Sequence, residues 1–375
     1  MRISLAWHNT LQNRKRSLAA VAGITFSILL VFMQLGFLQT ARVGSTLVYN
    51  YFNFDVIMTS DRFEALETAG WFDQARILQA RVVPVVESVM PLVYSRCRWR
   101  DPANHFLGSS CLTLGAELNP VFFPADDVPK LPAISTRGRI MLDRYASRDY
   151  GEIRVGKEAT LDGHDITIGA VFGIGLGFQA EGTGLVNLDT FQNVTRRDAR
   201  EVTFGLIRLA PGIRAEDGKA QLQAALPRDV ILFTKRELVQ RESDYYVNVK
   251  PIGIMFRAGA FVALCVGAVI LYQVLSTEIS NRLRELATLK AVGFTDRYVY
   301  GVGVQQALLF TGLSYGPAFI FSVAVFRLVF WVSHVPVDMT WNLAVTVLVL
   351  TIGMTTVASV LALQKVRRAD PADLF

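Results

Sequence analysis

The chain has 375 residues, of which 51% are hydrophobic and only 19% are charged. This charged share lies below the roughly 25% that is usual in soluble proteins, which argues against an ordinary soluble protein. The net charge of +6 is concentrated beside long apolar runs, so it does not indicate nucleic-acid binding.

Long runs without any charged residue occur four times, at residues 17–41, 258–277, 298–326 and 339–364. A helix needs about 20 apolar residues to cross a bilayer core, and each run is long enough. The first run exceeds the usual signal-peptide core and has no clear cleavage site after it, so we interpret it as an uncleaved anchor. The sequence therefore predicts one membrane-spanning helix, a large insertion and three further spanning helices.

The basic residues predict how the chain is oriented in the membrane. Residues 42–257 form the predicted extracytoplasmic domain, and from Arg42 to Lys250 they hold 25 basic and 26 acidic residues. Basic residues outnumber acidic ones in the segments expected on the other side, at residues 1–16, 278–297 and 365–375. Because Lys and Arg are retained on the cytoplasmic side, these three segments are predicted to be cytoplasmic. The large domain and the short loop at residues 327–338 would then lie outside, on the periplasmic side of an inner (cytoplasmic) membrane.

The insertion has the pattern of a mixed α+β domain between two helices that lead to the membrane. Residues 43–51 are predicted to continue the first helix, and residues 64–79 are expected to be helical. Short β-branched runs beside proline predict strands at residues 82–86 and 89–94. The remaining predicted strands and helices are strands at 111–115, 139–142, 203–209 and 230–233, a hairpin of 159–161 and 165–171 around Asp162-Gly163, and helices at 215–225 and 235–249.

The sequence contains no pattern typical of a catalytic or cofactor site. The glycine-rich residues 173–178 fit neither the dinucleotide-binding pattern nor the P-loop pattern. His105 and His164 lack metal-ligand spacing, and there is no G-x-S-x-G motif. We therefore expect a non-catalytic protein without a cofactor or a bound metal.

Two of the three cysteines, Cys97 and Cys111, lie in the predicted extracytoplasmic domain, where disulfides are possible. A bridge between them would close a loop of about 15 residues and stabilise the fold by about 3 kcal/mol. The sequence leaves both alternatives open, a Cys97–Cys111 disulfide or two unpaired thiols.

The predicted cytoplasmic loop contains a short amphipathic helix. Ile279, Leu283, Leu286 and Leu289 follow helical spacing and form one apolar stripe. Gly293 is placed to end the helix, since glycine adopts the left-handed conformation of a C-cap at low cost. Spacing alone does not decide whether this helix lies in the lipid headgroup layer or docks into a groove of a partner protein.

The residues of this loop resemble a known family. Residues 284–293, R-E-L-A-T-L-K-A-V-G, are similar to the R-E-I-x-x-L-(R/K)-A-(L/V)-G segment of FtsX/MacB/LolC-type ABC transporter permeases, with Leu286 where isoleucine is usual. The one-plus-three arrangement and the D-P-containing end at 366–375 also match, so the resemblance covers nearly the whole chain. Residues 5–9 and 22–37 look like the narrower DevC-like subgroup, which is associated with glycolipid export.

The resemblance implies a permease that does not hydrolyse ATP itself. In this family a separate cytoplasmic ATPase dimer binds two permeases, and the loop helix couples ATPase motion to the extracytoplasmic domain. Carried over by motif, the coupling residues are Arg284, Glu285, Leu286, Leu289, Lys290, Ala291 and Gly293.

The DevC-like resemblance further implies a periplasmic membrane-fusion adaptor, an outer-membrane channel and a permease homodimer. The expected fold is a four-span α-helical membrane protein with a MacB-like extracytoplasmic α+β domain. The expected function is an exporter permease for a lipid-like or other envelope substrate, with an FtsX-like regulator of cell-wall hydrolases as the alternative.

Overall fold

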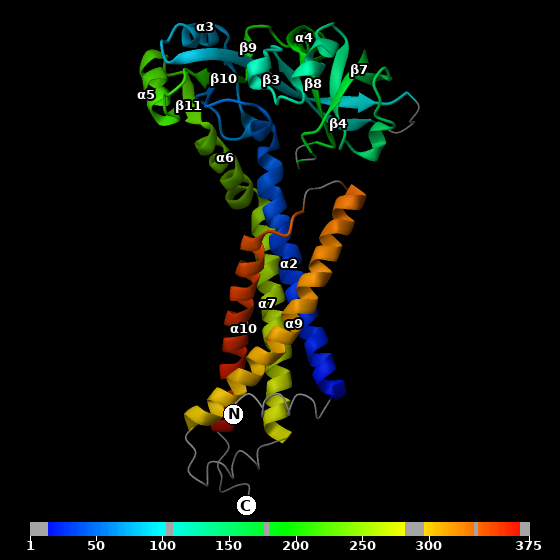
Figure 1. Cartoon of the computed structure of the whole chain (residues 1–375), viewed down its shortest axis with the longest axis vertical. Helices are drawn as coiled ribbons and strands as arrows, with labels where there is room; N and C mark the ends of the chain where they lie inside the picture. Colours follow the sequence, from blue (N-terminus) through cyan, green and yellow to red (C-terminus); the bar gives the residue numbers. More distant parts are fainter. Residues whose placement is uncertain are drawn as a thin grey trace, which may run out of the picture. The chain divides into compact units, whose positions relative to one another are not determined.

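The computed structural model describes residues 14–102, 108–175, 177, 180–281, 296–333 and 337–367. Its chain contacts divide it into two compact units. The helical unit contains residues up to Gln39, Ile254–Trp331 and the residues from Val337 onward. The α+β unit contains Thr40–Gly253 and Val332–Pro336. Figure 1 shows the elements of both.

The helical unit is built from long apolar helices. These are α2 (Arg14–Tyr51), whose last turns belong to the α+β unit, α7 (Pro251–Asn281), α9 (Asp296–Ser333) and α10 (Trp341–Arg367). In the described part of the chain, the segments long and apolar enough to span a membrane number four: Leu18–Tyr51, Pro251–Thr277, Val304–Val332 and Trp341–Ala362. The predicted four-span architecture with a large α+β domain is thus confirmed.

Hydroxyl groups join these helices where their apolar faces meet. Ser27 Oγ on α2 donates to the carbonyl of Ala263 on α7 over 2.6 Å. Thr25 Oγ1 on α2 donates to the carbonyl of Ser314 on α9 over 3.2 Å. Lipid tails offer no hydrogen-bond partners, so small polar residues in spanning helices bond across helix interfaces.

The α+β unit contains a sheet of nine strands in the order β11-β1-β10-β3-β4-β8-β5-β7-β6. Their bounds are β1 Val56–Ser60, β3 Val86–Arg100, β4 Ser109–Ala116, β5 Arg139–Asp143, β6 Glu158–Leu161, β7 His164–Phe172, β8 Gly182–Asn187, β10 Phe204–Leu209 and β11 Val230–Thr234. The last strand, β6, also pairs with β3, which closes β3, β4, β8, β5, β7 and β6 into a ring. A separate pair joins β2 (Phe72–Asp73) to β9 (Glu201–Val202).

Short helices flank both parts of this sheet. Those with α-helical geometry are α3 (Ala75–Arg81), α4 (Leu188–Thr195), α5 (Ala215–Ala225) and α6 (Lys235–Asp244). The helix α3 contacts β3 and α5 contacts β11, whereas α4 contacts β4 and β8 (Figure 1). Short 3-10 helices occur at Leu66–Thr68, Pro120–Phe122, Val128–Ile134 and Arg148–Tyr150.

Most of the predicted local elements agree with the structure. The hairpin around Asp162-Gly163 is formed by β6 and β7, the predicted helix 215–225 has the same bounds as α5, and the helix at 43–51 belongs to α2. These elements depend on signals close in sequence, such as a turn dipeptide or an uninterrupted helical pattern.

Two predicted elements were wrong. Residues 64–79 are not one helix, because Gly70 adopts a φ of +68° and Phe72 pairs with β9. The strand predicted at 82–86 is also wrong, because residues 82–85 form a turn, whereas the strand predicted at 89–94 lies within the 15-residue strand β3. Pairing of β3 with β4 begins only at Leu92, so the amide that Pro91 lacks is not needed on that side.

Candidate functional site

The predicted coupling residues between Arg284 and Gly293 lie outside the described residues. The described part of the chain instead shows how the two helices that lead to the membrane are attached to the α+β unit. We call residues 40–53 the α2 root and residues 234–253 the α6 root. Both roots belong to the α+β unit.

The α2 root is embedded in an aromatic core. Phe52 is fully buried and meets the rings of Tyr51 and Phe123 at centroid distances of 5.1 and 5.5 Å. Tyr51 donates its hydroxyl to Asp127 Oδ2 over 2.9 Å. Asn53 donates its backbone amide to the carbonyl of Phe122 over 2.8 Å. The end of α2 is therefore held mainly by apolar packing, supported by hydrogen bonds to the segment around residues 122–127.

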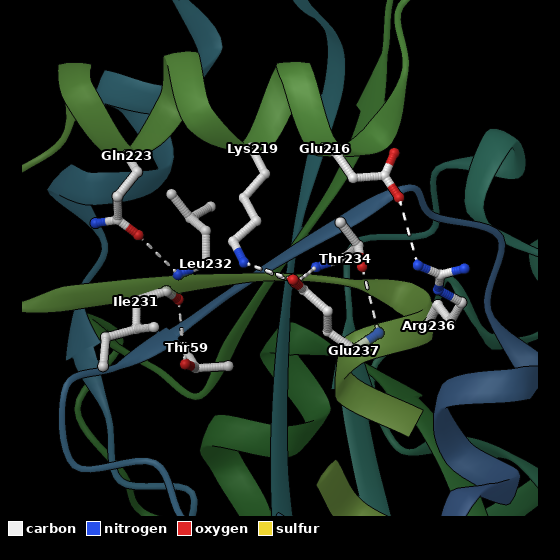
Figure 2. Close-up of polar contacts among 9 residues, drawn as sticks. All are labelled: Thr59, Glu216, Lys219, Gln223, Ile231, Leu232, Thr234, Arg236 and Glu237. Carbon is white, nitrogen blue, oxygen red and sulfur yellow. Dashed lines mark hydrogen bonds and ion pairs between the residues drawn. The ribbon is translucent and has the colours of Figure 1, made fainter. Parts of the chain in front are cut away.

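The α6 root begins with a complete capping box. Thr234 Oγ1 accepts from the amide of Glu237 over 3.3 Å, and Glu237 Oε2 accepts from the amide of Thr234 over 2.8 Å. Two amides that the helix itself leaves unpaired are thereby satisfied. Figure 2 shows Lys219 reaching from α5 to Glu237, with 2.7 Å between Nζ and Oε2. The start of α6 is thus fastened to β11 and to α5.

A second polar contact from α5 holds β11 itself. The side-chain oxygen of Gln223 accepts from the amide of Leu232 over 3.2 Å (Figure 2). On the other side of the strand, Thr59 Oγ1 on β1 donates to the carbonyl of Ile231 over 3.2 Å. The strand that leads into α6 is therefore bonded to both neighbouring elements.

The two roots are bonded to each other at two levels. Lys235, the first residue of α6, donates its ammonium to the carbonyl of Phe52 at the end of α2 over 2.7 Å. About two helical turns further along α6, Glu242 Oε2 accepts from the hydroxyl of Tyr49 over 3.2 Å. The amide of Leu66 lies within 3.1 Å of both carboxyl oxygens of Glu242. A movement of either root would have to break these bonds or carry the other root with it.

Burial controls the charge at these two contacts. Glu242 is fully buried, and this burial raises the pKa of its carboxyl to about 7, although the bonds from Leu66 and Tyr49 act in the opposite direction. Burial likewise lowers the pKa of the Lys235 ammonium, partly offset by the nearby carboxylate of Asp55. Glu242 can therefore change charge near neutral pH, which an exposed glutamate does not do.

The helix predicted at 235–249 is confirmed as a helical segment, but its last turn is not α-helical. The helix α6 ends at Asp244 and is followed by a π-helical turn at Tyr245–Val249. Lys250 is extended, with φ −73° and ψ 145°, and α7 begins at Pro251. Proline disfavours a helical conformation in the residue before it, which explains the break.

An ionic contact lies beside this break. Lys250 Nζ is 2.7 Å from Glu67 Oε2, and Tyr246 donates its hydroxyl to Glu67 Oε1 over 3.1 Å. Partial burial would raise the pKa of Glu67, but these hydrogen bonds and the nearby Arg96 outweigh it and lower the pKa. The interrupted segment is thus tied to the 3-10 turn that also carries the amide of Leu66.

The two cysteines lie opposite each other on neighbouring strands of the sheet. Cys97 on β3 is directly opposite Cys111 on β4, and both are buried free thiols. Burial raises the pKa of Cys97 to about 12 and that of Cys111 to about 11, so both are protonated at neutral pH. Opposite residues have Cβ atoms about 4.5–5.5 Å apart, slightly more than the roughly 3.8 Å of a disulfide. The two alternatives, a bridge or two unpaired thiols, are distinguished by the mass of the purified protein before and after reduction.

The two roots are thus hydrogen-bonded to each other, and the start of α6 is also bonded to α5. Among the described residues, no group of three metal-binding side chains lies close enough to hold a metal ion. The sequence signal that predicts the capping box is the T-x-x-E pattern at residues 234–237. No signal marked Glu242 as buried, because it lies in a highly charged helical segment.

Two family models match the sequence. The MacB-like periplasmic core domain matches residues 17–225, more than half of the chain, and the FtsX-like permease C-terminal domain matches residues 257–371. None of the curated proteins matches significantly.

Solved structures with a similar chain include the periplasmic region of MacB from Actinobacillus actinomycetemcomitans. It is 12% identical, with a TM-score of 0.37, over 52% of this chain and 94% of that one. The extracellular domain of the noncanonic ABC-type transporter YknZ from Gram-positive bacteria is 10% identical, with a TM-score of 0.34, over 48% of this chain and 100% of that one. Similarity at this level transfers no residue role, so the two family models carry the assignment.

Proposed function

Because this chain belongs to the family of ABC transporter permeases with a MacB-like periplasmic core domain and an FtsX-like C-terminal domain, we propose that it transmits the motion of a separate cytoplasmic ATPase to its extracytoplasmic domain. The transmitted motion drives export of a lipid-like or other envelope substrate through a periplasmic adaptor and an outer-membrane channel. The permease itself is non-catalytic and acts as a homodimer in the inner membrane.

The observation that carries this proposal is the two side-chain hydrogen bonds that join the roots. Lys235 donates to the carbonyl of Phe52 at the end of α2, and Tyr49 donates to Glu242, so the ends of the two helices are held together. The α2 root continues the same helix as the first spanning segment, which ends at Tyr51. A helix transmits displacement along its axis because each turn is held by hydrogen bonds to the next.

The predicted orientation supports the direction of transmission. The basic segments at residues 1–16, 278–297 and 365–375 favour a cytoplasmic side on which the ATPase is found. On that side the apolar stripe of Leu286 and Leu289 would fill a groove of the ATPase, and Glu285 with Lys290 would set the polarity of docking. These roles remain proposals for residues outside the described structure.

The first experiment tests association with the ATPase. The full-length permease is co-expressed with a candidate soluble ABC ATPase from the same genome and purified through a tag on the permease. We expect the wild type and the control Asp338→Arg, in the loop between the third and fourth spans, to retain the ATPase. Glu285→Arg and Gly293→Pro should lose it. Unchanged retention in both variants would contradict the coupling assignment.

The second experiment tests transmission in the same purified complex. Amide hydrogen exchange of residues 40–53 and 234–253 is measured with and without a non-hydrolysable ATP analogue. We expect exchange at both roots to change together in the wild type. In Lys235→Met combined with Glu242→Leu the ATPase should still bind, but the two roots should respond separately. If amide exchange at both roots of the wild type were the same with and without the analogue, transmission would be refuted.

A further inference from the structure

A cavity of about 680 Å³ lies where β3 is flanked by β4 and β6. Arg96, Arg98 and Arg100 occupy alternate positions of β3 and all three line the cavity. Alternate residues of a strand face the same side of the sheet. Arg98 is paired with Ser110 on β4, and Arg100 is paired with Thr160 on β6. Three guanidinium groups therefore lie on the same face of the sheet, near the pairing of β3 with β6 that closes the ring.

The same cavity is lined by two carboxylates, each held by a backbone amide. Asp162 Oδ1 accepts from the amide of Arg98 over 2.7 Å, and Glu181 Oε2 accepts from the amide of Ser110 over 3.2 Å. The hydrogen bonds fix where the negative charges lie without neutralising them.

The charges of opposite sign in this cavity are not paired with one another. Within the described part of the chain, the side chains of Arg98 and Arg100 make no ion pair, and Asp162 and Glu181 make none either. Arg96 differs, because it lies 3.7 Å from Glu67. Among the described residues, the cavity thus presents two cations and two anions that form no ion pair with one another.

This charge pattern selects the chemistry of a ligand. A simple anion would be attracted by the arginines and repelled by the carboxylates, and a simple cation would meet the reverse. A guanidinium group binds phosphate through two parallel hydrogen bonds, whereas a carboxylate needs a donor such as an ammonium group. Only a ligand with both groups satisfies all four side chains.

We propose that this cavity binds a zwitterionic phosphate ester carrying a primary amine, with its phosphate on Arg98 and Arg100 and its ammonium group on Asp162 and Glu181. The source of this chemistry is either a free phosphoester or the headgroup of a lipid. The site does not depend on the function proposed above, since it needs neither an ATPase nor transport.

An unsatisfied hydroxyl marks the same wall of the cavity. Ser110 lines the cavity, and its Oγ is buried without a hydrogen-bond partner among the described residues. Buried polar atoms in native proteins are nearly always paired, so an unpaired one indicates a missing ligand or water. A change of the Ser110 side-chain rotamer would direct this hydroxyl at a phosphate bound by the neighbouring Arg98.

Calorimetric titration of the full-length protein in detergent tests the site. The probes are phosphoethanolamine, inorganic phosphate, ethanolamine and glycerol 3-phosphate, which keeps the phosphate but has hydroxyls instead of the amine. We expect phosphoethanolamine to bind about tenfold more tightly than each of the other three. Equal binding of glycerol 3-phosphate, or no saturable binding of phosphoethanolamine, would overturn the proposal.

A fifth probe, dihexanoyl phosphatidylethanolamine below its micellar concentration, distinguishes the two sources. Binding at least as tight as that of phosphoethanolamine supports a lipid headgroup. Much weaker binding of the lipid, with phosphoethanolamine still bound, supports a free phosphoester.

Variants separate the two halves of the site. Arg98→Gln and Arg100→Gln should weaken phosphoethanolamine and inorganic phosphate alike, by about tenfold. Glu181→Gln keeps an acceptor for the Ser110 amide but removes the charge. It should weaken phosphoethanolamine while strengthening inorganic phosphate. Arg228→Gln, an exposed arginine between α5 and β11, is the control and should change nothing. The assignment would be refuted if Arg228→Gln weakened phosphoethanolamine binding as much as the other arginine variants do. It would also be refuted if Glu181→Gln changed the affinities for phosphoethanolamine and inorganic phosphate in the same direction.

Discussion

The α2 root and the α6 root attach two helices to the same domain in different ways. The α2 root is one uninterrupted helix whose end is buried among aromatic rings. The α6 root is held by charged and polar contacts and is interrupted by a π-helical turn and the extended residue Lys250. Apolar packing depends little on pH or salt, whereas polar contacts respond to both. The α2 root is therefore the stiffer attachment, whereas the α6 root can bend and its polar contacts change with pH.

The largest effect should come from the packing of the α2 root. Phe52→Ala removes a fully buried ring from the aromatic core and should lower the free energy of unfolding by about 3–5 kcal/mol. Chemical denaturation of the full-length protein in detergent, followed by tryptophan fluorescence, measures it. Val82→Ala is the control, because Val82 is 81% exposed and its truncation should have little effect. A small loss for Phe52→Ala would mean that packing does not hold this root.

The second effect concerns the buried carboxyl of the α6 root. Because the pKa of Glu242 rises from 4.5 to about 7 on folding, the folded protein favours the protonated form. The stability that this provides is complete below about pH 4.5 and is lost as the pH rises through 7, by roughly 3 kcal/mol in total. Glu242→Gln is neutral at every pH and keeps an acceptor for the Leu66 amide. It should therefore match the wild type near pH 4.5 and exceed its stability at pH 8.

Glu67→Gln provides a control of opposite sign for this pH dependence. The pKa of Glu67 is lowered in the fold, so its ionised form is the stabilising one and its contribution is lost as the pH falls. This variant should be less stable than the wild type at pH 8. Melting curves of both variants between pH 4.5 and 8 measure this dependence. If the stability of Glu242→Gln changed with pH in parallel with that of the wild type, the buried-carboxyl interpretation would be contradicted.

The third effect tests the interruption itself. A Cβ at Gly253 would overlap the backbone carbonyl of Val247, so Gly253→Ala should open the π-helical turn at a cost of about 1–3 kcal/mol. Amide exchange should become faster at residues 245–250 and stay unchanged at the α2 root. Gly301→Ala is the matched control, since a Cβ there meets no atom within 4 Å. Equal exchange in the two variants would show that the turn is not sensitive to its packing.

The smallest effect concerns the capping box at the start of α6. Thr234→Ala removes the hydroxyl that accepts from the amide of Glu237 and should cost about 1 kcal/mol. Thr234→Ser keeps the hydroxyl and should stay close to the wild type in the same denaturation measurement. If both variants lost the same stability, the methyl group of Thr234 and not its hydrogen bond would matter.

Local sequence signals predicted much of the fold but little of the candidate site. The hairpin of β6 and β7 and the helix α5 follow from a turn dipeptide and from helical spacing. The helix predicted over 64–79 failed because the pairing of Phe72 with Val202 is a contact between residues far apart in sequence. Glu242 has the same neighbours in sequence as many exposed glutamates, and only its contacts with Tyr49 and Leu66 show that it is buried.

The sequence by itself determined the number of long apolar helices, the place of the large domain between the first and second, and the family. These properties depend on the length of apolar runs and on contiguous motifs, which are local. Only the tertiary structure decided that β6 closes a ring with β3, that Lys235 meets the end of α2, and that Arg98 shares a cavity with Glu181. Each of these depends on bringing together residues more than 50 positions apart, a choice made by the packing of the whole domain.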